Sequence, residues 1–181
     1  MQSNHCAAPP LGGWWAVLLS VGLGACSPVL DWREVRTPGA TVAVLMPCRP
    51  GAQQRELPLA GAPVVLTLQA CSAGGQTWAL VSADVGDPAR VGPALQALLS
   101  ASASKLNAAV PAGQAFAPRG STPNPHSRRA QLAASAPDGG EMRLDSAVFA
   151  HGTWVFQATV LGGLADQEAV EGFFASLRAL S

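Results

Sequence analysis

A cysteine that follows small residues is the part of this 181-residue chain with the most distinctive chemistry. Cys26 comes directly after Leu23-Gly24-Ala25, at the end of an uncharged apolar run that starts at Trp14. A thiol is the strongest side-chain nucleophile and can accept a lipid group. The small residues before it leave the peptide bond open to a peptidase. This spacing therefore favours cleavage and acylation at Cys26.

The run before Cys26 is typical of a secretory signal, because it is too short to span a bilayer comfortably. Leu23-Gly24-Ala25-Cys26 resembles the bacterial lipobox. That resemblance implies a signal peptide over residues 1–25, a thioether-linked diacylglycerol on Cys26 and a further acyl chain, such as palmitate, on the new amino terminus. Two or more chains anchor a protein stably. Two alternatives are an ordinary signal cut at another small residue and an uncleaved anchor. Residues 1–13 contain no Lys or Arg, although signals normally begin basic.

Residues 26–40 are expected to be a lipidated tether, followed by a single domain over residues 41–181. Ser27 stands where an aspartate would favour retention in the inner membrane. We therefore expect a protein of the bacterial cell envelope that faces the periplasm, held by the outer rather than the inner membrane. Trp32 either sits at the membrane interface or packs on the edge of the domain.

The charge balance excludes a general attraction to nucleic acid. Lys and Arg number 11, Asp and Glu number 11, and there is no Tyr. Neither a basic field nor a base-stacking platform is indicated. The expected partners are a membrane, through the lipid anchor, and an envelope protein.

Cys48 and Cys71 form a natural pair once Cys26 is assigned to lipid. A disulfide is expected in an oxidising compartment, and the spacing fits no zinc pattern. If the strands on either side of Gly61 form a hairpin, Cys71 lies opposite roughly Gly51, close to Cys48 around a turn. The alternative is two buried free thiols in adjacent strands.

The pattern of apolar residues and turns predicts an α+β domain, with an antiparallel sheet of about six to seven strands and two main helices packed on it. Asp87-Pro88 is a typical helix start, whereas Asp84 and Asp87 could alternatively be a catalytic carboxylate pair. The expected strands are 41–46, 53–59, 64–71, 77–83, 129–136, 141–150 and 153–161. The expected helices are 87–106 and a second one from Asp166, with an apolar stripe that continues to Leu180.

Residues 108–128 are rich in Pro, Gly, Ser and Asn and predict a long irregular loop, either solvated and mobile or a partner-binding surface. After the signal, the histidines are His126 and His151. The sequence contains no Gly-x-Ser-x-Gly, no His-Glu-x-x-His and no phosphate-binding loop. We therefore expect no enzyme, no catalytic residues, no cofactor and no metal.

Several segments resemble PsbP-like domains. They are Met46-Pro47-Cys48-Arg49-Pro50 at a strand end, the strand 75–84, Gly152-Thr153-Trp154-Val155-Phe156-Gln157, and Gly172-Phe173-Phe174-Ala175-Ser176-Leu177. The resemblance implies an α/β/α sandwich on an antiparallel sheet and a non-catalytic binding or assembly factor. As a whole, the chain is similar to small proteobacterial envelope lipoproteins. It departs from the PsbP-like pattern at Cys48 and Cys71 and in the long Pro-rich loop.

Three functions follow as hypotheses. The first is a membrane-anchored, non-catalytic binding or assembly accessory domain. The second is a small-ligand binder with a pocket between sheet and helix, lined by residues such as Trp78 and Trp154. The third is an envelope hydrolase that uses His126 or His151.

Overall fold

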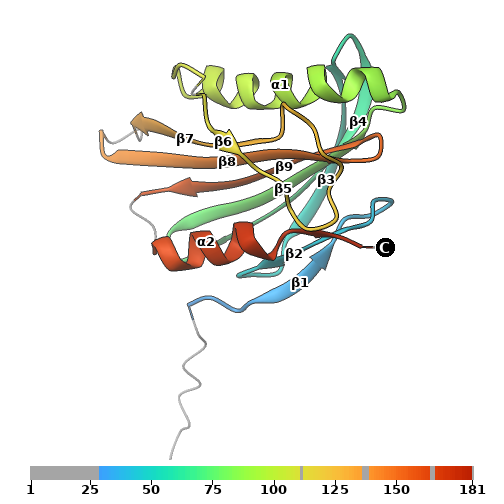
Figure 1. The fold of residues 1–181 in the computed structure, drawn as a ribbon. Helices are drawn as coiled ribbons and strands as arrows, with labels where there is room; N and C mark the ends of the chain where they lie inside the picture. The colour runs from blue at the N-terminus through green and yellow to red at the C-terminus, as the bar shows by residue number, and fades with distance from the viewer. Residues whose placement is uncertain (1–28, 111, 136–138, 164–165, 181) are drawn as a thin grey trace, which may run out of the picture.

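The computed structural model describes residues 29–110, 112–135, 139–163 and 166–180. Within these residues the chain forms two helices and two antiparallel sheets, which confirms the predicted α+β class (Figure 1). In chain order the elements are β1 (Arg33–Arg36), β2 (Val42–Met46), β3 (Gly51–Leu59), β4 (Ala62–Ala73), β5 (Gln76–Asp84), α1 (Pro88–Lys105), β6 (Gln114–Ala115), β7 (Arg128–Ser135), β8 (Glu141–His151), β9 (Trp154–Gly162), α2 (Gln167–Ser176) and β10 (Arg178–Ala179).

The larger sheet has seven strands in the order β3-β4-β5-β9-β8-β7-β6. Glycines with positive φ occupy the turns of its hairpins, as at Gly61 between β3 and β4 and at Gly152 between β8 and β9. The centre of the sheet joins the two halves of the chain. There β5 pairs with β9 from Gln76 opposite Gly162 to Asp84 opposite Trp154.

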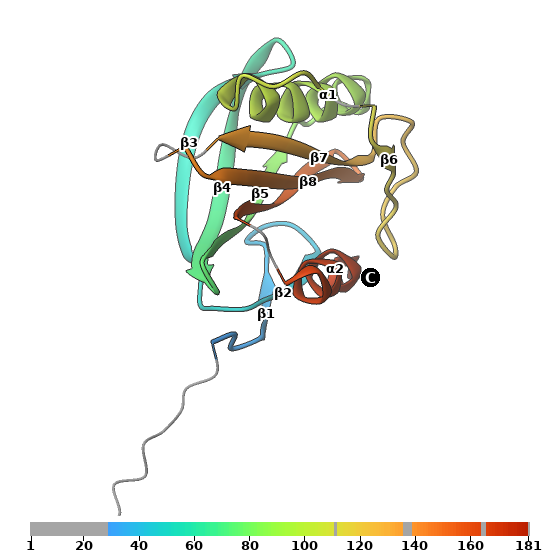
Figure 2. The same ribbon diagram turned by 90° about the vertical axis from the view of Figure 1, so that its left-hand side faces the viewer.

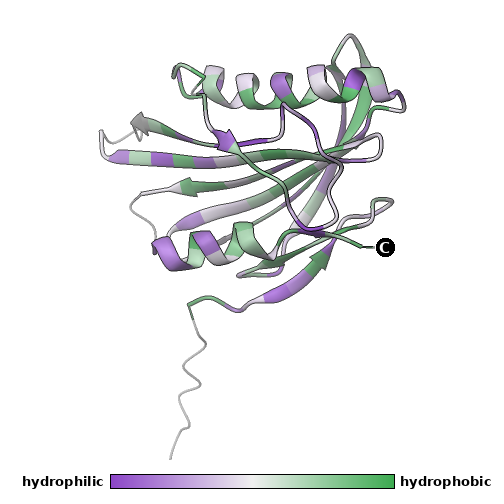
Figure 3. Cartoon of the chain, in the orientation of Figure 1, coloured by the Kyte–Doolittle hydropathy of each residue, from purple (hydrophilic) through white to green (hydrophobic). Residues whose placement is uncertain are grey.

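Helix α1 covers one face of this sheet. Asp87 is its N-cap and accepts a hydrogen bond from the Ala89 amide at 2.8 Å, with Pro88 at the first helical position. The predicted apolar stripe is confirmed, because Val91 and Leu95 are among the residues buried against the sheet. In Figure 3 the hydrophobic colour gathers where α1 faces the strands.

Helix α2 and the smaller sheet cover the opposite face (Figure 2). The smaller sheet has the order β1-β2-β10. Its central strand β2 is hydrophobic and buried, and Phe173 of α2 lies edge-on to Trp78 at a centroid distance of 5.4 Å. Phe156, Ala158 and Val160 of β9 belong to this core, whereas Val155 points to α1, as the period of a strand requires.

Two parts of the sequence prediction need correction at the ends of the domain. The expected tether contains strand β1, which pairs with β2, and Trp32 packs edge-on to Trp78. The last helix ends at Ser176 and does not continue to Leu180. Leu177 is extended and buried, and Arg178 and Ala179 pair with β2. The open edge of β2 offers unpaired backbone groups, which outweigh the helical spacing of the leucines.

The Pro-rich segment over residues 108–128 is not a free loop. Phe116 donates its amide to Ser127 and packs its ring against Phe149 and Phe174. Further along, the Thr122 amide bonds to the Ala150 carbonyl at 2.8 Å. These contacts hold the described part of the segment to β8 and α2. Apart from the two-residue strand β6 and isolated bridges, it is irregular, as predicted.

Candidate functional site

An open apolar groove lies between α1 and the β3–β4 hairpin. Figure 2 shows how this hairpin bends. Its volume is about 490 Å³, within the range of about 300–1,000 Å³ typical of small-molecule sites. The lining residues are mostly apolar and come from β3, β4, β5, α1 and β9: Gln53, Arg55, Leu57, Pro58, Leu59, Leu66, Leu68, Val81, Ala97, Leu98, Ala101, Ser102, Lys105 and Gln157.

The sequence itself explains why this space stays open. Ala97, Ala101 and Ser102 lie on the side of α1 that faces the groove, and their side chains are small. Opposite them, Leu57 and Leu68 on the hairpin remain 48% and 37% exposed. A helix with larger residues at these positions would cover the two leucines. The hairpin therefore presents apolar side chains that no described residue fully covers.

Two polar side chains at the floor of the groove, Gln157 and Ser102, form hydrogen bonds within the protein. The Gln157 Nε2 lies 2.9 Å from the Ser102 hydroxyl, 3.0 Å from the Ser146 hydroxyl and 3.3 Å from the Leu98 carbonyl. Ser102 also donates to the Leu98 carbonyl. These bonds use the amide N–H groups of Gln157 inside the fold, so these N–H groups are not available to a ligand.

The charges on the groove are of one sign. Arg55 and Lys105 line it, and the set of lining residues includes no Asp or Glu. Arg55 comes from the edge strand β3 and Lys105 from the last turn of α1, so the two cations stand on opposite walls. An anionic group in the groove would therefore be attracted from both sides.

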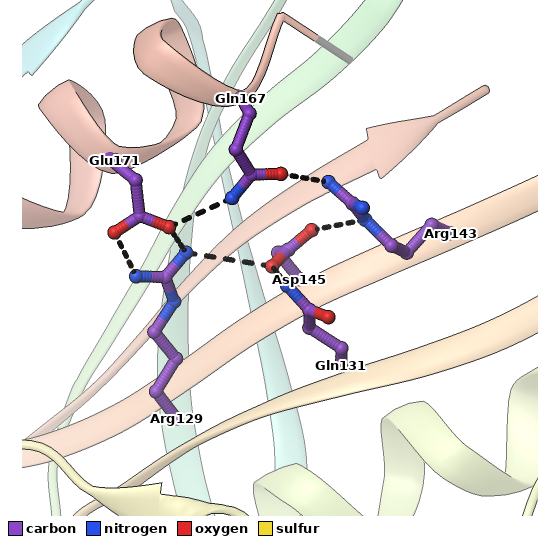
Figure 4. Close-up of polar contacts among 6 residues, drawn as sticks. All are labelled: Arg129, Gln131, Arg143, Asp145, Gln167 and Glu171. Carbon is purple, nitrogen blue, oxygen red and sulfur yellow. Dashed lines mark hydrogen bonds and ion pairs between the residues drawn. The ribbon is translucent and has the colours of Figure 1, made fainter. Parts of the chain in front are cut away.

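A network of polar side chains joins β7, β8 and α2 on the other face of the larger sheet (Figure 4). Asp145 is only 2% exposed and accepts hydrogen bonds from Arg143 and Gln131, both at 2.8 Å, while Arg129 lies 3.5 Å away. Arg129 also binds Glu171 of α2 through two bonds of 2.7 Å. The buried carboxylate is thus paired, as burial of a charge requires.

This network fixes α2 against the sheet. Gln167 donates to Glu171 and accepts from Arg143, and the Arg129 guanidinium lies 4.1 Å from the centroid of the Phe174 ring. The hydrogen bonds from Arg129 lower the pKa of Glu171 below its ordinary value of 4.5. The arrangement is a structural clamp, because each described carboxylate in it already has a cationic partner.

A second carboxylate with a lowered pKa, that of Glu34, lies on the smaller sheet. Hydrogen bonds from Arg36 and Arg178 lower the pKa of Glu34, with Arg36 the larger cause. Arg178 belongs to β10, so this ion pair joins the two edge strands across β2.

Cys48 and Cys71 form the predicted disulfide, with their Cα atoms 6.0 Å apart. The predicted register is nearly correct, because Gly51 lies opposite Ala70. Cys48 follows β2 and Cys71 belongs to β4, so the bond links the smaller sheet to the larger one. This geometry fits a disulfide and not the alternative of two separate thiols.

Other residues singled out from the sequence lie apart from the groove. Asp84 accepts from the Gly86 amide and the Thr153 hydroxyl, and Asp87 caps α1, so both carboxylates have structural roles. A ring nitrogen of His151 lies 3.1 Å from the Gly120 carbonyl, while His126 lies against Gly92 of α1. Cys26 lies outside the described residues.

The sequence prediction placed the pocket on the wrong face of the sheet. Trp78 is 1% exposed and belongs to the core under α2, and Trp154 packs against the same core. The groove lies on the α1 face and depends on Leu57, Leu66 and Leu68, which sequence reasoning did not single out. The available sequence signal was the run of small residues 100–104, which follows the apolar residues Leu98 and Leu99 in the last turns of α1.

Three further findings complete the description. Among the described residues, no group of His, Cys, Asp and Glu is arranged to hold a metal ion. Neither helix in the described part of the chain combines the length and apolarity needed to cross a membrane. A scan against protein-family models finds no match, and no curated protein matches the sequence.

Proposed function

We propose that this chain is a lipid-anchored protein of the bacterial cell envelope, acylated at Cys26, whose PsbP-like domain acts as a non-catalytic binding or assembly factor. The observation that carries the anchor is the sequence Leu23-Gly24-Ala25-Cys26 at the end of an uncharged apolar run. The absence of aspartate at position 27 favours the outer membrane, with the domain facing the periplasm.

The disulfide supports export to an oxidising compartment. Disulfides persist in the periplasm and are rare in the reducing cytosol. Because Cys48 and Cys71 bind each other, Cys26 does not compete with them for a partner. It is therefore available for lipid in the exported chain.

The position of the first described residues supports a short connection between the proposed lipid on Cys26 and the domain. Leu30 lies within van der Waals reach of Gly74 in the turn between β4 and β5, and the Asp31 amide bonds to the Pro47 carbonyl. Four peptide units separate Cys26 from Leu30, a reach of about 14 Å at most. A lipid on Cys26 would hold the β4–β5 turn close to the membrane surface.

Intact-mass measurement of the protein extracted from native membranes tests the anchor. We expect a chain that begins at Cys26, carries the added mass of diacylglyceryl and acyl groups, and gains the mass of two hydrogen atoms when the disulfide is reduced. A Cys26→Ser variant should lose the lipid mass, whereas a Cys48→Ser/Cys71→Ser variant should keep it. An unmodified mass for residues 1–181 would overturn the anchor.

A chemical cross-linking experiment tests the accessory role. Cross-linking in intact cells, followed by purification of the full chain, should recover one specific envelope protein. A Cys26→Ser chain provides the control, because it removes the proposed lipid site. Recovery of no protein above this control in repeated experiments would contradict an assembly role, and binding of a small ligand would then be the better assignment.

A further inference from the structure

The groove between α1 and the β3–β4 hairpin has the chemistry of a site for an amphiphile. Its walls carry mainly leucine and alanine side chains, and at its floor the Gln157 amide nitrogen binds Ser102 and Ser146. A peptide could bind here only by pairing its backbone with the edge strand β3, whereas an alkyl chain requires no hydrogen bond. The mostly apolar lining suits a hydrocarbon chain.

The charges define the other end of the ligand. Arg55 and Lys105 line the same groove from opposite walls. No ion pair of either side chain is found among the described residues, whereas the arginines of the clamp are paired with carboxylates. Two unpaired cations beside an apolar channel are complementary to one negatively charged head group.

The size of the groove limits the number of chains. A volume of about 490 Å³ lies in the lower half of the range for small-molecule sites, about 300–1,000 Å³. We therefore propose that the groove binds a free single-chain anionic amphiphile, such as a fatty acid, with the alkyl chain against Leu57, Leu66 and Leu68 and the head group between Arg55 and Lys105. This inference does not depend on the lipid anchor, because the groove lies within the described domain.

Photo-cross-linking of the full chain in phosphatidylcholine nanodiscs tests the proposal. The probe is tetradecanoic acid with a diazirine in its chain, and peptide mass spectrometry locates the adducts after irradiation. We expect adducts on β3, β4 and residues 97–105 of α1. Absence of adducts from these segments would overturn the proposal.

Paired variants make the test specific. Ala101→Trp should fill the groove and reduce labelling there at least tenfold, whereas Ser104→Trp, at an exposed position of the same helix, should leave it unchanged. Arg55→Gln/Lys105→Gln should weaken labelling about fivefold, as expected for two exposed charge contacts. Arg49→Gln is the matched charge control outside the groove. Equal labelling of a variant and its control would contradict the proposal.

Probe chemistry separates the sources of the ligand. A neutral tetradecanol probe and a diacyl phosphatidylglycerol probe should both label the groove less than the fatty acid. Stronger labelling by the diacyl probe would replace a free amphiphile with a bilayer lipid and overturn the proposal. Adducts confined to residues 26–33 would also overturn it, while leaving the anchor on Cys26 intact.

Discussion

At the scale of single residues, Asp145 is a buried charge that depends on its ion-pair partners. Its carboxylate is 2% exposed and lies between Arg129 and Arg143. We expect Asp145→Asn to lower the free energy of unfolding by about 3 kcal/mol, because two partly buried guanidinium groups lose their shared counterion. Urea unfolding measures the change.

Glu171 provides the matched control for this prediction. It also binds Arg129, but its side chain is 54% exposed. Glu171→Gln should therefore lower the free energy of unfolding by no more than about 1 kcal/mol. Equal losses for the two variants would show that burial does not set the importance of these carboxylates.

The same exposed glutamate makes stability depend on pH. Hydrogen bonds from Arg129 lower the pKa of folded Glu171 below 4.5, so folding favours its charged form. This contribution is fully present above the pKa of the unfolded chain and is lost as the pH falls through the lowered folded-state value. The difference in unfolding free energy between wild type and Glu171→Gln should shrink as the pH falls from 6 to below 4.5. A difference that stays constant with pH would contradict the role of this ion pair.

Residue roles were predictable from sequence where the partners are close along the chain. Asp87 caps the helix that follows it, and Asp84 bonds to Gly86 two residues away, so local chemistry was sufficient. Arg129 and Glu171 are 42 residues apart and meet only because α2 returns to β7 and β8. No local pattern contains that information.

At the scale of elements, the Cys48–Cys71 disulfide joins the two sheets. The bond closes a loop with a sequence separation of 23 residues, and its removal should lower the free energy of unfolding by about 3 kcal/mol. Urea unfolding of Cys48→Ala/Cys71→Ala measures the loss. Reduction of wild type should reproduce that loss and leave the variant unchanged. A wild-type midpoint that does not respond to reduction would contradict this stabilising role.

The hairpins were predictable because each turn marks its own position in the sequence. Gly61, Gly74-Gly75 and Gly152 connect strands long enough to show an alternating pattern. Strands β1 and β10 have four and two residues, too few for a pattern, and exist because they pair with β2. Strand β2 was predicted, but its place in a separate sheet depends on these distant partners.

At the scale of the whole molecule, curvature and layer order create the groove. The sequence predicted helices packed on a sheet, and the structure places α1 on one face and α2 with the smaller sheet on the other. The groove arises because the β3–β4 hairpin bends past the side of α1 that carries small residues. The groove could not be predicted from the positions where strands and helices begin and end, because it depends on how the hairpin and α1 pack in space.

The proposed anchor predicts that one particular end of the domain faces the membrane. The first described residues lie beside β1 and the β4–β5 turn. Helix α1 lies at the opposite end of the domain (Figure 1). A lipid on Cys26, with a reach of about 14 Å to Leu30, would keep the β4–β5 turn near the bilayer. A photoreactive amino acid in place of Thr77, an exposed residue at the start of β5, should therefore cross-link to lipid in proteoliposomes.

The same amino acid in place of Ala89, an exposed residue in the first turn of α1, is the matched control. It should cross-link to lipid at least tenfold less than the Thr77 variant, because the domain stands between α1 and the anchored end. Mass spectrometry of the lipid adducts measures both yields. Equal yields would contradict a fixed orientation and would mean that the domain tumbles freely about its anchor.

A Leu30→Ser variant tests the contact between Leu30 and Gly74. If this contact holds the β4–β5 turn beside the anchor, the substitution should raise the cross-linking yield at position 89 towards the yield at position 77. If the domain tumbles freely, the substitution should change neither yield.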